Sequence, residues 1–271
     1  TVVVLHPTKK QAFIARKGVD LTVVNGPIHV NSSDSKEAAI VKDNSTVTAT
    51  TIKVKGGYTE KKSGDFSPNP TTGVDPLRDP LAMLNPPSKS GRPVYSKVDH
   101  SSKTALTLSP GVYNGGIKVH GDADVTLLPG VYYINGGGFE VDTKGDLMGD
   151  GVMIFNSGSK TGSDEAMFNK CRLKVGGTLT LTAPTSGDYE GVSIFNDRGN
   201  TKEVKIDSKA TDQTITGTIY APNAKVHIHG KGTFGGSQII SACGRFCADG
   251  NITLKYDPSK VAKPRFLSLV E

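Results

Sequence analysis

A chain of 271 residues with 32 glycines, no tryptophan and few helix-forming stretches favours one long all-β domain over a helical or mixed fold. Its net charge of +6 is spread along the sequence without a basic stripe or interleaved aromatic residues, which argues against a nucleic-acid partner. No run of 18 apolar residues occurs, so the sequence predicts no membrane-spanning helix.

The first part of the chain holds two units that resemble each other, "KGVDLTVVNGPIHVNSS" at 17–33 and "KDNSTVTATTIKVKGG" at 42–57. Each consists of short β-branched runs separated by glycine, asparagine or aspartate. This punctuation is typical of short strands joined by turns. We therefore expect the chain to begin with strands.

Residues 56–98 have a different texture, rich in proline, which cannot donate a hydrogen bond within a sheet. We interpret this segment as a long excursion from a single domain that spans 1–271. Its apolar cluster is expected to pack against the side of that domain, with the flanking residues exposed. The cluster consists of Leu77, Leu81, Met83 and Leu84.

Beyond the excursion the sequence repeats itself, first as "LSPGVYNGG" at 108–116 and then as "LLPGVYYINGGG" at 127–138. No unit has the leucine skeleton of a leucine-rich repeat, and no helical repeat pattern is present. The spacing predicts a single-stranded right-handed parallel β-helix, a solenoid of about 20 residues per coil. One step of 40 residues is interpreted as two coils, the second near 171–183. The glycines that open the repeated units are Gly111, Gly130, Gly151, Gly191 and Gly217.

Stacked coils place like residues in columns. An asparagine column predicts a structural ladder in which side-chain amides bond along the stack. Two apolar columns, one of Val131, Val152 and Val192 and one of Tyr133, Ile154 and Ile194, are expected to point inward. The asparagines of the predicted ladder are Asn114, Asn135, Asn156 and Asn196.

An alternative function for such a fold is that of a polysaccharide lyase or glycoside hydrolase. A lyase would need clustered carboxylates for a cation, and the candidates are Asp122, Asp142, Asp146 and Asp150. Ordinary turn aspartates explain the same residues. For catalysis the best candidates are Asp197 and Arg198 with Asp188 or Glu190, although a surface salt bridge would account for them equally. No cofactor is expected.

Three cysteines are too few for a disulfide framework. In "CGRFC" a bridge between Cys243 and Cys247 is one hypothesis, which leaves Cys171 free. Unpaired thiols are the second hypothesis. A zinc site that also recruits His227 and His229 of "KVHIHG" is a third, although both histidines would equally suit an outward strand face.

Segments in order along the chain, among them "NGPIHVNSSDSKEAAIV", "DPLAMLNPP", "GVMIFNSG", "LTAPTSGDYEGVSIFNDRGN" and "GTIYAPNAKVHIHGKGT", resemble the glycine-rich extracytoplasmic region of bacterial Tad (Flp) pilus assembly-like proteins, of the TadE/TadG-like type. The resemblance implies a protein of the bacterial cell envelope. It implies contact with a membrane only through an anchor that this sequence does not contain. No catalytic residues come with it.

The sequence therefore predicts a non-enzymatic, extracytoplasmic protein of the cell envelope or of a pilus, with a structural or adhesive role. Regularly spaced polar groups on a solenoid suit repetitive partners, so surface polysaccharide or another envelope component is the expected ligand.

Overall fold

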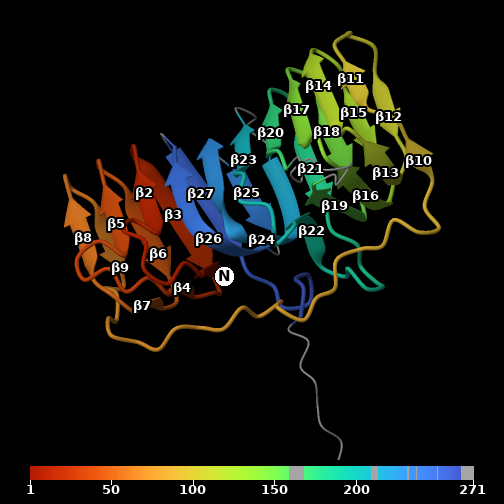
Figure 1. Cartoon of the computed structure of the whole chain (residues 1–271). Coiled ribbons are helices and arrows are strands. Elements are labelled where there is room, and N and C mark those ends of the chain that lie inside the picture. Colours follow the sequence, from red (N-terminus) through yellow and green to blue (C-terminus); the bar gives the residue numbers. More distant parts are fainter. Residues whose placement is uncertain (159–167, 209–212, 231, 236, 249, 264–271) are drawn as a thin grey trace, which may run out of the picture.

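The computed structural model describes residues 1–158, 168–208, 213–230, 232–235, 237–248 and 250–263. These residues form strands, turns and loops without a helix, so the all-β prediction is confirmed. Every pairing between neighbouring strands is parallel, and together the strands form a curved, solenoid-like stack (Figure 1). The described residues contain no helix of the length and apolar character that a membrane span requires.

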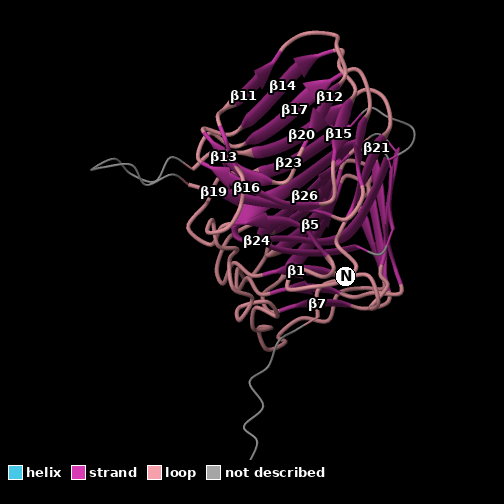
Figure 2. Ribbon diagram, turned by 90° about the vertical axis from the view of Figure 1, so that its right-hand side faces the viewer, coloured by secondary structure: helices cyan, strands magenta, loops and turns pink. Residues whose placement is uncertain are grey.

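The strands stack in three rows, each running the length of the molecule (Figure 2). Along the first row, from one end to the other, lie β7 (Ile52–Val54), β4 (Ile28–Val30), β1 (Val2–Val4), the first half of β26 (Ser237–Cys247), the middle of β24 (Gln213–Gly230), β22 (Val192–Asn196), β19 (Val152–Ser157), β16 (Gly130–Asn135), β13 (Gly111–Asn114) and β10 (Val94–Tyr95).

The second row, in the same direction, contains β8 (Tyr58–Lys61), β5 (Ala39–Lys42), β2 (Phe13–Arg16), the ends of β26 and β24, β23 (Val204–Ser208), β20 (Cys171–Val175), β17 (Phe139–Thr143), β14 (Ile117–Gly121) and β11 (Val98–His100).

The third row contains β9 (Asp65–Ser67), β6 (Thr46–Ala49), β3 (Val19–Val24), β27 (Gly250–Lys255), β25 (Gly232–Gly235), the start of β24, β21 (Leu179–Thr182), β18 (Leu147–Gly149), β15 (Val125–Leu127) and β12 (Leu106–Leu108).

The order of the coils in space differs from their order in the chain. Val2 of β1 pairs with Ile28 on one side and with Ile239 on the other, so the chain starts in the middle of the stack. Residues 1–67, the N-terminal block, build toward one end. Residues 94–260, the C-terminal block, start at the opposite end and return to the middle (Figure 1). The stack is therefore one continuous pile made from two separate stretches of chain.

A strap, residues 68–93, connects the two blocks along the outside of the stack (Figure 1). It is shorter than the predicted excursion of 56–98, because β8 and β9 already belong to the N-terminal block and β10 starts at Val94. Two side chains of the strap, Leu81 and Leu84, are buried as expected, with exposures of 1% and 3%. The expectation was wrong for Leu77 and Met83, which are 42% and 53% exposed.

Inside the stack, apolar side chains of the first row form one continuous inward column. Side chains at alternate positions point the other way and form an outward column, which the strap partly covers. The inward column contains Tyr132, Ile154, Ile194, Ile219, Ile239, Val2, Ile28 and Ile52. The outward column contains Val112, Tyr133, Phe155, Phe195, Tyr220, Ile240 and Val3.

The predicted apolar columns were out of register by one residue at β16. Val131 pairs with Met153 and Tyr133 with Phe155, so Tyr133 points outward. The opening glycines were a poor guide, because Gly130 pairs with Val152 instead of Gly151, and Gly111 pairs with Tyr132 instead of Gly130. From β19 onward Ile154 and Ile194 do share an inward column, as predicted. The valine column was wrong at this step as well, because Val152 belongs to the inward cluster and Val192 to the outward one.

The step of 40 residues is one coil and not two. Asn156 pairs directly with Asn196, and the stretch 171–183, expected to be a separate coil, supplies β20 and β21 of that same coil. Residues 159–167, also part of this step, lie outside the described residues.

The paired glycines of the repeat mark a corner where successive coils touch through their backbones. A Cβ atom on Gly137 would lie 2.0 Å from the carbonyl oxygen of Gly115, and one on Gly116 would lie 2.5 Å from that of Gly138. Both glycines also have positive φ, 76° and 87°. The motifs "NGG" and "NGGG" are thus required by the close approach of two turns.

The order of the coils predicts that the chain tolerates circular permutation. Thr1 and Tyr256 both lie beside Gly26, where the two blocks meet, so a short glycine linker from residue 260 to Thr1 closes the gap. A permutant that starts at Val94 and ends at Ser67 should unfold cooperatively in thermal melts, with the far-ultraviolet circular dichroism of the parent. Its stability should be lower by the contribution of the missing strap. A permutant without β structure would contradict the arrangement.

Candidate functional site

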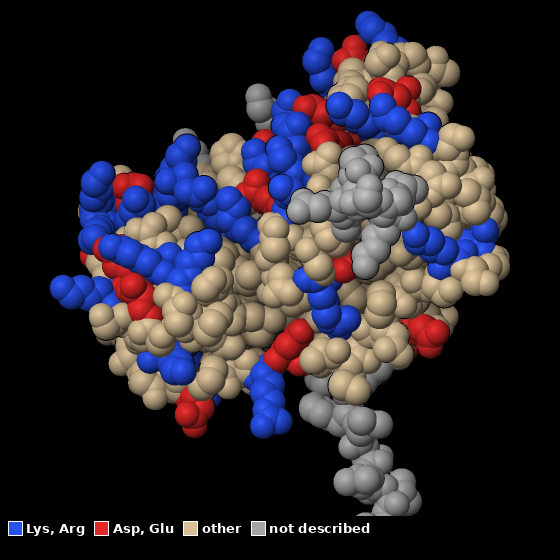
Figure 3. Space-filling view, in the orientation of Figure 1, with Lys and Arg blue, Asp and Glu red and all other residues tan. Residues whose placement is uncertain are grey.

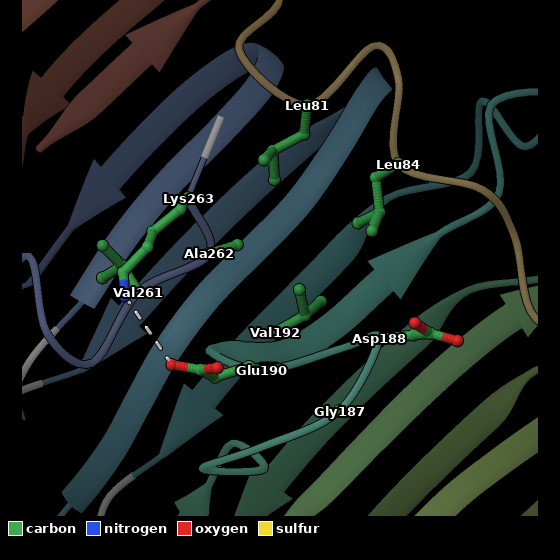
Figure 4. A pocket seen from close by; sticks show the side chains of 9 residues that line it. All are labelled: Leu81, Leu84, Gly187, Asp188, Glu190, Val192, Val261, Ala262 and Lys263. Carbon is green, nitrogen blue, oxygen red and sulfur yellow. Dashed lines mark ion pairs between the residues drawn. The ribbon is translucent and has the colours of Figure 1, made fainter. Parts of the chain in front are cut away.

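The four residues proposed for catalysis do not come together. Asp188 and Glu190 line a cavity of about 180 Å³ with Lys263, whose Nζ lies 3.9 Å from a carboxylate oxygen of Glu190 (Figure 4). Asp197 and Arg198 are not among its lining residues, which include Leu81 and Leu84 of the strap. The cavity lies where the strap meets the loop before β22. It does not bring together the four residues that were proposed for catalysis.

Arg198 is a clamp for the strap. Its Nη2 donates to the carbonyl oxygens of Leu81, Ala82 and Leu84 at 2.7, 3.1 and 3.0 Å. Its Nε donates to the hydroxyl of Tyr220 at 3.1 Å, and that hydroxyl donates to Asp79 of the strap at 2.6 Å. A guanidinium presents several donors in a fixed plane, so it suits this set of carbonyl acceptors.

The carboxylate of Asp197 stabilises a turn. It accepts hydrogen bonds from the Ser157 hydroxyl at 2.9 Å and from the Gly199 amide at 2.8 Å. Glu190, one of the two salt-bridge partners that the sequence suggested, has Lys263 Nζ at 3.9 Å.

The aspartates proposed as cation ligands are dispersed and already partnered. Asp122 pairs with Lys103 and Lys144, and Asp142 pairs with Arg172 and Lys174. Asp146 and Asp150 accept hydrogen bonds from the next coil, from the Thr178 amide and the Thr182 hydroxyl. Within the described ranges no group of three or more His, Cys, Asp or Glu could hold a metal ion.

The asparagine ladder is interrupted. Asn135 pairs with Ser157 instead of Asn156, so the four residues form two separate pairs. In the outer pair, Asn135 donates to Asn114 at 2.6 Å near the surface. In the buried pair, Asn156 donates to Asn196 at 2.9 Å, and the Asn200 amide bonds the same oxygen at 3.2 Å. Only the second pair is enclosed in the stack.

The disulfide hypothesis was wrong, because all three cysteines are free thiols. Cys243 and Cys247 lie on one straight stretch of β26 that pairs residue by residue with β24. Four residues of extended strand place their Cα atoms about 13 Å apart. A disulfide needs roughly 4.4 to 6.8 Å.

The outward side chains of the second row form a charged face, defined here by β14, β17, β20, β23, β24, β26, β2 and β5. Toward β14 the face is balanced, since Asp142 pairs with Lys174 at 2.9 Å and Asp207 pairs with Lys205 at 2.8 Å. Figure 3 shows cationic and anionic side chains interspersed on this side of the molecule, with Lys and Arg dominating the upper left.

The other part of the charged face, where the two blocks meet, carries mainly cations. The outward residues of β24, β26, β2 and β5 in this part include no aspartate or glutamate. We call this part the cationic half. Within the described chain, the buried Nε of Arg245 has no hydrogen-bond partner. The basic residues of the cationic half are Lys225, His227, His229, Arg245, Arg16 and Lys42. The three on β24, Lys225, His227 and His229, are paired with Glu203 or Asp207.

A thiol lies at the centre of the cationic half. Four side chains, each on or beside a different strand, form a diagonal line that runs from Glu203 through His227 to Cys247 and Arg16. His227 Nδ1 is 3.1 Å from a Glu203 carboxylate oxygen, and Arg16 Nε donates to Cys247 Sγ at 3.4 Å. The zinc hypothesis had placed Cys247 with the two histidines, and the structure does bring them together, but without a metal-binding set among the described residues.

The ionisation of these groups is coupled. Burial alone would raise the pKa of Cys247, but the neighbouring His227 and Arg16 favour the ionised thiol, outweigh burial and lower that pKa. Burial alone would lower the pKa of His227, but its interactions with Cys247 and Glu203 raise it. Burial also opposes ionisation of Glu203, yet His227 and Lys225 hold its pKa at about 2. These interactions stabilise the thiolate of Cys247 and the imidazolium of His227 against the opposing effect of burial.

Comparison with known proteins places most of this structure in one family. The family model described as "Domain of unknown function (DUF7305)" matches residues 94–260. The chain belongs to the DUF7305 family. No curated protein and no solved structure matches it.

The DUF7305 region coincides with the C-terminal block, from β10 to just beyond β27. The N-terminal block and the strap lie outside the matched residues. The thiol cluster therefore spans the border of the family region, because Arg16 comes from the N-terminal block and the other three residues come from the DUF7305 region.

Sequence inspection missed this cluster as a unit. Two segments of the sequence pointed to parts of the cluster. Alternation in "KVHIHG" predicts that both histidines point outward, and alternation in "CGRFC" predicts a cysteine on the same face. Their neighbours Glu203 and Arg16 are distant in sequence, and only the pairing of β23 and β2 with these strands brings them close.

The asparagine pairs generate a matched comparison. Asn196→Ala should lower the free energy of unfolding by about 1 to 3 kcal/mol, because it leaves buried amides of Asn156 and Asn200 without their acceptor. Asn114→Ala removes an exposed partner and should cost less than about 0.5 kcal/mol. Chemical denaturation measures both, and equal effects would refute the division into a buried and a surface pair.

Arg198→Lys tests the clamp. The substitution keeps the charge but loses most of the bonds to the strap carbonyls, so the free energy of unfolding should fall by about 1 to 3 kcal/mol. Native-state trypsin cleavage after Arg78 should become faster. Arg92→Lys, on an exposed part of the strap, is the control and should change neither quantity. An Arg198→Lys variant with parental stability and cleavage would show that the strap does not depend on this residue.

Proposed function

We propose that this DUF7305 protein is a non-enzymatic structural or adhesive module of the bacterial cell envelope that binds an anionic surface polymer along its cationic half. The observation that carries the proposal is the row of Arg245, Arg16 and Lys42 on consecutive strands β26, β2 and β5, without an acidic residue among the outward residues of these strands.

The fold supports a repetitive ligand. We infer a right-handed solenoid with coils of about 20 residues, because parallel strands joined by crossovers are right-handed in nearly all known cases. Hydrogen bonds between adjacent coils join residues separated by 20, 21, 25 and 26 positions, and by 40 where a coil carries an insertion.

The spacing of the cations supports a polymer over a small molecule. Adjacent strands lie about 4.8 Å apart, so a chain that runs along the stack meets a new strand at roughly the interval of a sugar unit. Arg245, Arg16 and Lys42 would each meet a successive anionic group. A single small anion would use only one or two of these positions.

The polar chemistry of the rest of the molecule supports a role without catalysis. Most of the acidic residues considered for catalysis or cation binding serve turns, hydrogen bonds between coils or ion pairs between coils. The envelope location and the relation to a pilus rest on the sequence resemblance to Tad pilus assembly-like proteins, and a partner among envelope components follows from that location.

A binding experiment tests the polymer. Polygalacturonate should co-sediment with the protein at low salt and release it as salt rises, because exposed charges are screened. Arg245→Gln combined with Lys42→Gln should weaken binding at least tenfold. The matched control, Lys53→Gln with Lys55→Gln, neutralises two exposed cations outside the charged face and should change binding less than twofold.

Two results would overturn the proposal. Equal weakening in both double variants would remove the cationic half as the binding surface, and equal binding of neutral dextran would remove the requirement for anions. The same mixtures should yield no unsaturated products and no new reducing ends. Their release would replace an adhesive role with that of a lyase or hydrolase.

A further inference from the structure

A buried thiol with two cationic neighbours has no role in polymer binding, although it lies within the charged face. Cys247 is only 2% exposed. It accepts a hydrogen bond from Arg16 Nε at 3.4 Å. His227, whose ring is oriented by Glu203, lies on the neighbouring strand β24, two residues before His229, the cross-strand partner of Cys247. An acid, an imidazole and a thiol in sequence form the arrangement by which proteins activate a cysteine nucleophile.

We propose that Cys247 is a nucleophilic thiol that reacts with small electrophiles, hydroperoxides in particular. The line of Glu203, His227 and Cys247 across three adjacent strands supplies the activation, and Arg16 supplies a second positive charge on the opposite side of the sulfur.

The roles follow from the positions. His227 Nδ1 faces Glu203, so that nitrogen carries a proton and the carboxylate accepts it. The other ring nitrogen, Nε2, is buried and has no conventional hydrogen bond within the described residues. That atom is the one available to hold a proton toward the sulfur. The fixed ring and the nearby guanidinium stabilise a thiolate once the thiol proton has moved to Nε2.

The reaction balances with a peroxide as the only co-reactant. The sulfur lone pair attacks one peroxide oxygen, an S–O bond forms, and the O–O bond breaks. The leaving hydroxide takes the Nε2 proton of the His227 imidazolium and departs as water. The sulfur is oxidised by two electrons to a sulfenic acid, and the peroxide is reduced.

Two features of the surroundings shape this chemistry. The low exposure of Cys247 excludes bulky electrophiles. Cys243 lies about 13 Å away along the same strand, too far for a disulfide to resolve the sulfenic acid. The oxidised state therefore persists until an external reductant removes it.

The other cysteines are internal controls in the same molecule. Burial raises the pKa of Cys171 to about 12 and also raises that of Cys243. Neither should react in the native state. The charged groups that face or neighbour Cys247 are Arg16 on β2, Arg245 on β26, Lys225, His227 and His229 on β24, and Glu203, Lys205 and Asp207 on or beside β23.

The test is a pH profile of alkylation by iodoacetamide in the native protein, with the modified cysteine identified by peptide mass spectrometry. An ordinary thiol, with a pKa of about 8.5, reacts roughly fifty-fold or more slowly at pH 6 than at pH 8. Cys247 should slow at most about tenfold. After the native protein has been treated with hydrogen peroxide, dimedone added together with denaturant should label the sulfenic acid at Cys247 and at neither other cysteine.

Variants separate activation from simple access. His227→Gln keeps a hydrogen-bonding side chain without the charge and should restore the steep profile of an ordinary thiol. His229→Gln is the comparison on the same strand. His229 lies directly opposite Cys247 in the strand pairing, but its Nδ1 is 2.8 Å from Asp207 and its side chain is 46% exposed, so this variant should leave the profile shallow. Arg16→Lys keeps the charge and should resemble the parent, whereas Arg16→Gln should steepen the profile. Circular dichroism checks that each variant is folded.

Three outcomes would overturn the proposal. Cys247 could fail to react in the native protein, or it could show the profile of an ordinary thiol. His227→Gln and His229→Gln could also have the same effect, which would remove His227 as the activating group. The absorbance of the thiolate at 240 nm, taken as the parent minus Cys247→Ser, gives the same titration without any reagent that must reach the sulfur.

Discussion

The structure depends on the backbone hydrogen bonds that join its two blocks. A parallel strand edge presents unpaired amides and carbonyls, and a solenoid cut in the middle would expose such an edge on each half. Here the edges satisfy each other. The Ile239 amide donates to Thr1 at 2.9 Å, the Leu5 amide to Ser241 at 2.8 Å, and the Tyr256 amide to Val24 at 2.9 Å. The junction thereby makes one stack from two blocks that are separated by the strap in the chain.

The strap follows from this arrangement. Because the chain leaves the stack at one end and re-enters at the other, a connection must run along the whole side. It lies over the outward apolar column, where edge-to-face rings of Phe155, Phe195 and Tyr220 are spaced 5.0 Å apart. Arg198 contacts two of these rings and bonds the strap carbonyls at the same time. The strap covers apolar surface that would otherwise face water.

The sequence predicted the class of fold because parallel stacking imposes columns of similar residues, and glycine-punctuated repeats record them. It could not predict the register at β16, because a shift of one position moves every side chain to the other face of the strand without changing the composition of the strand. It also could not predict the order of the coils. Any coil with an inward apolar row can pair with any other, so nothing in "TVVVLHP" specifies that β1 pairs with β26.

The candidate site was predictable only in part, for a related reason. Alternation within "KVHIHG" and "CGRFC" fixes which side chains share a face. The diagonal contact between His227 and Cys247 depends on the stagger of β24 against β26, and the contact to Arg16 depends on the junction. Residues proposed for catalysis from one local stretch, such as Asp197 and Arg198, were instead used in a turn and a clamp. Polar residues that cluster in one solenoid loop are thus better evidence for structural contacts of that loop than for a catalytic site.

The proposed polyanion site lies across the junction, so ligand binding there would be linked to assembly. Arg16 and Lys42 come from the N-terminal block, whereas Arg245, His227 and Cys247 come from the DUF7305 region. A polyanion that contacts both sets of cations binds the docked state more tightly than the separated one, so it stabilises the junction by mass action. The thiolate of Cys247 acts in the same direction, because its attraction to Arg16 exists only when β2 is paired with β26. Oxidation of the thiolate to a neutral sulfenic acid removes that attraction, and the chemical state of one sulfur thereby changes the free energy that holds the two blocks together.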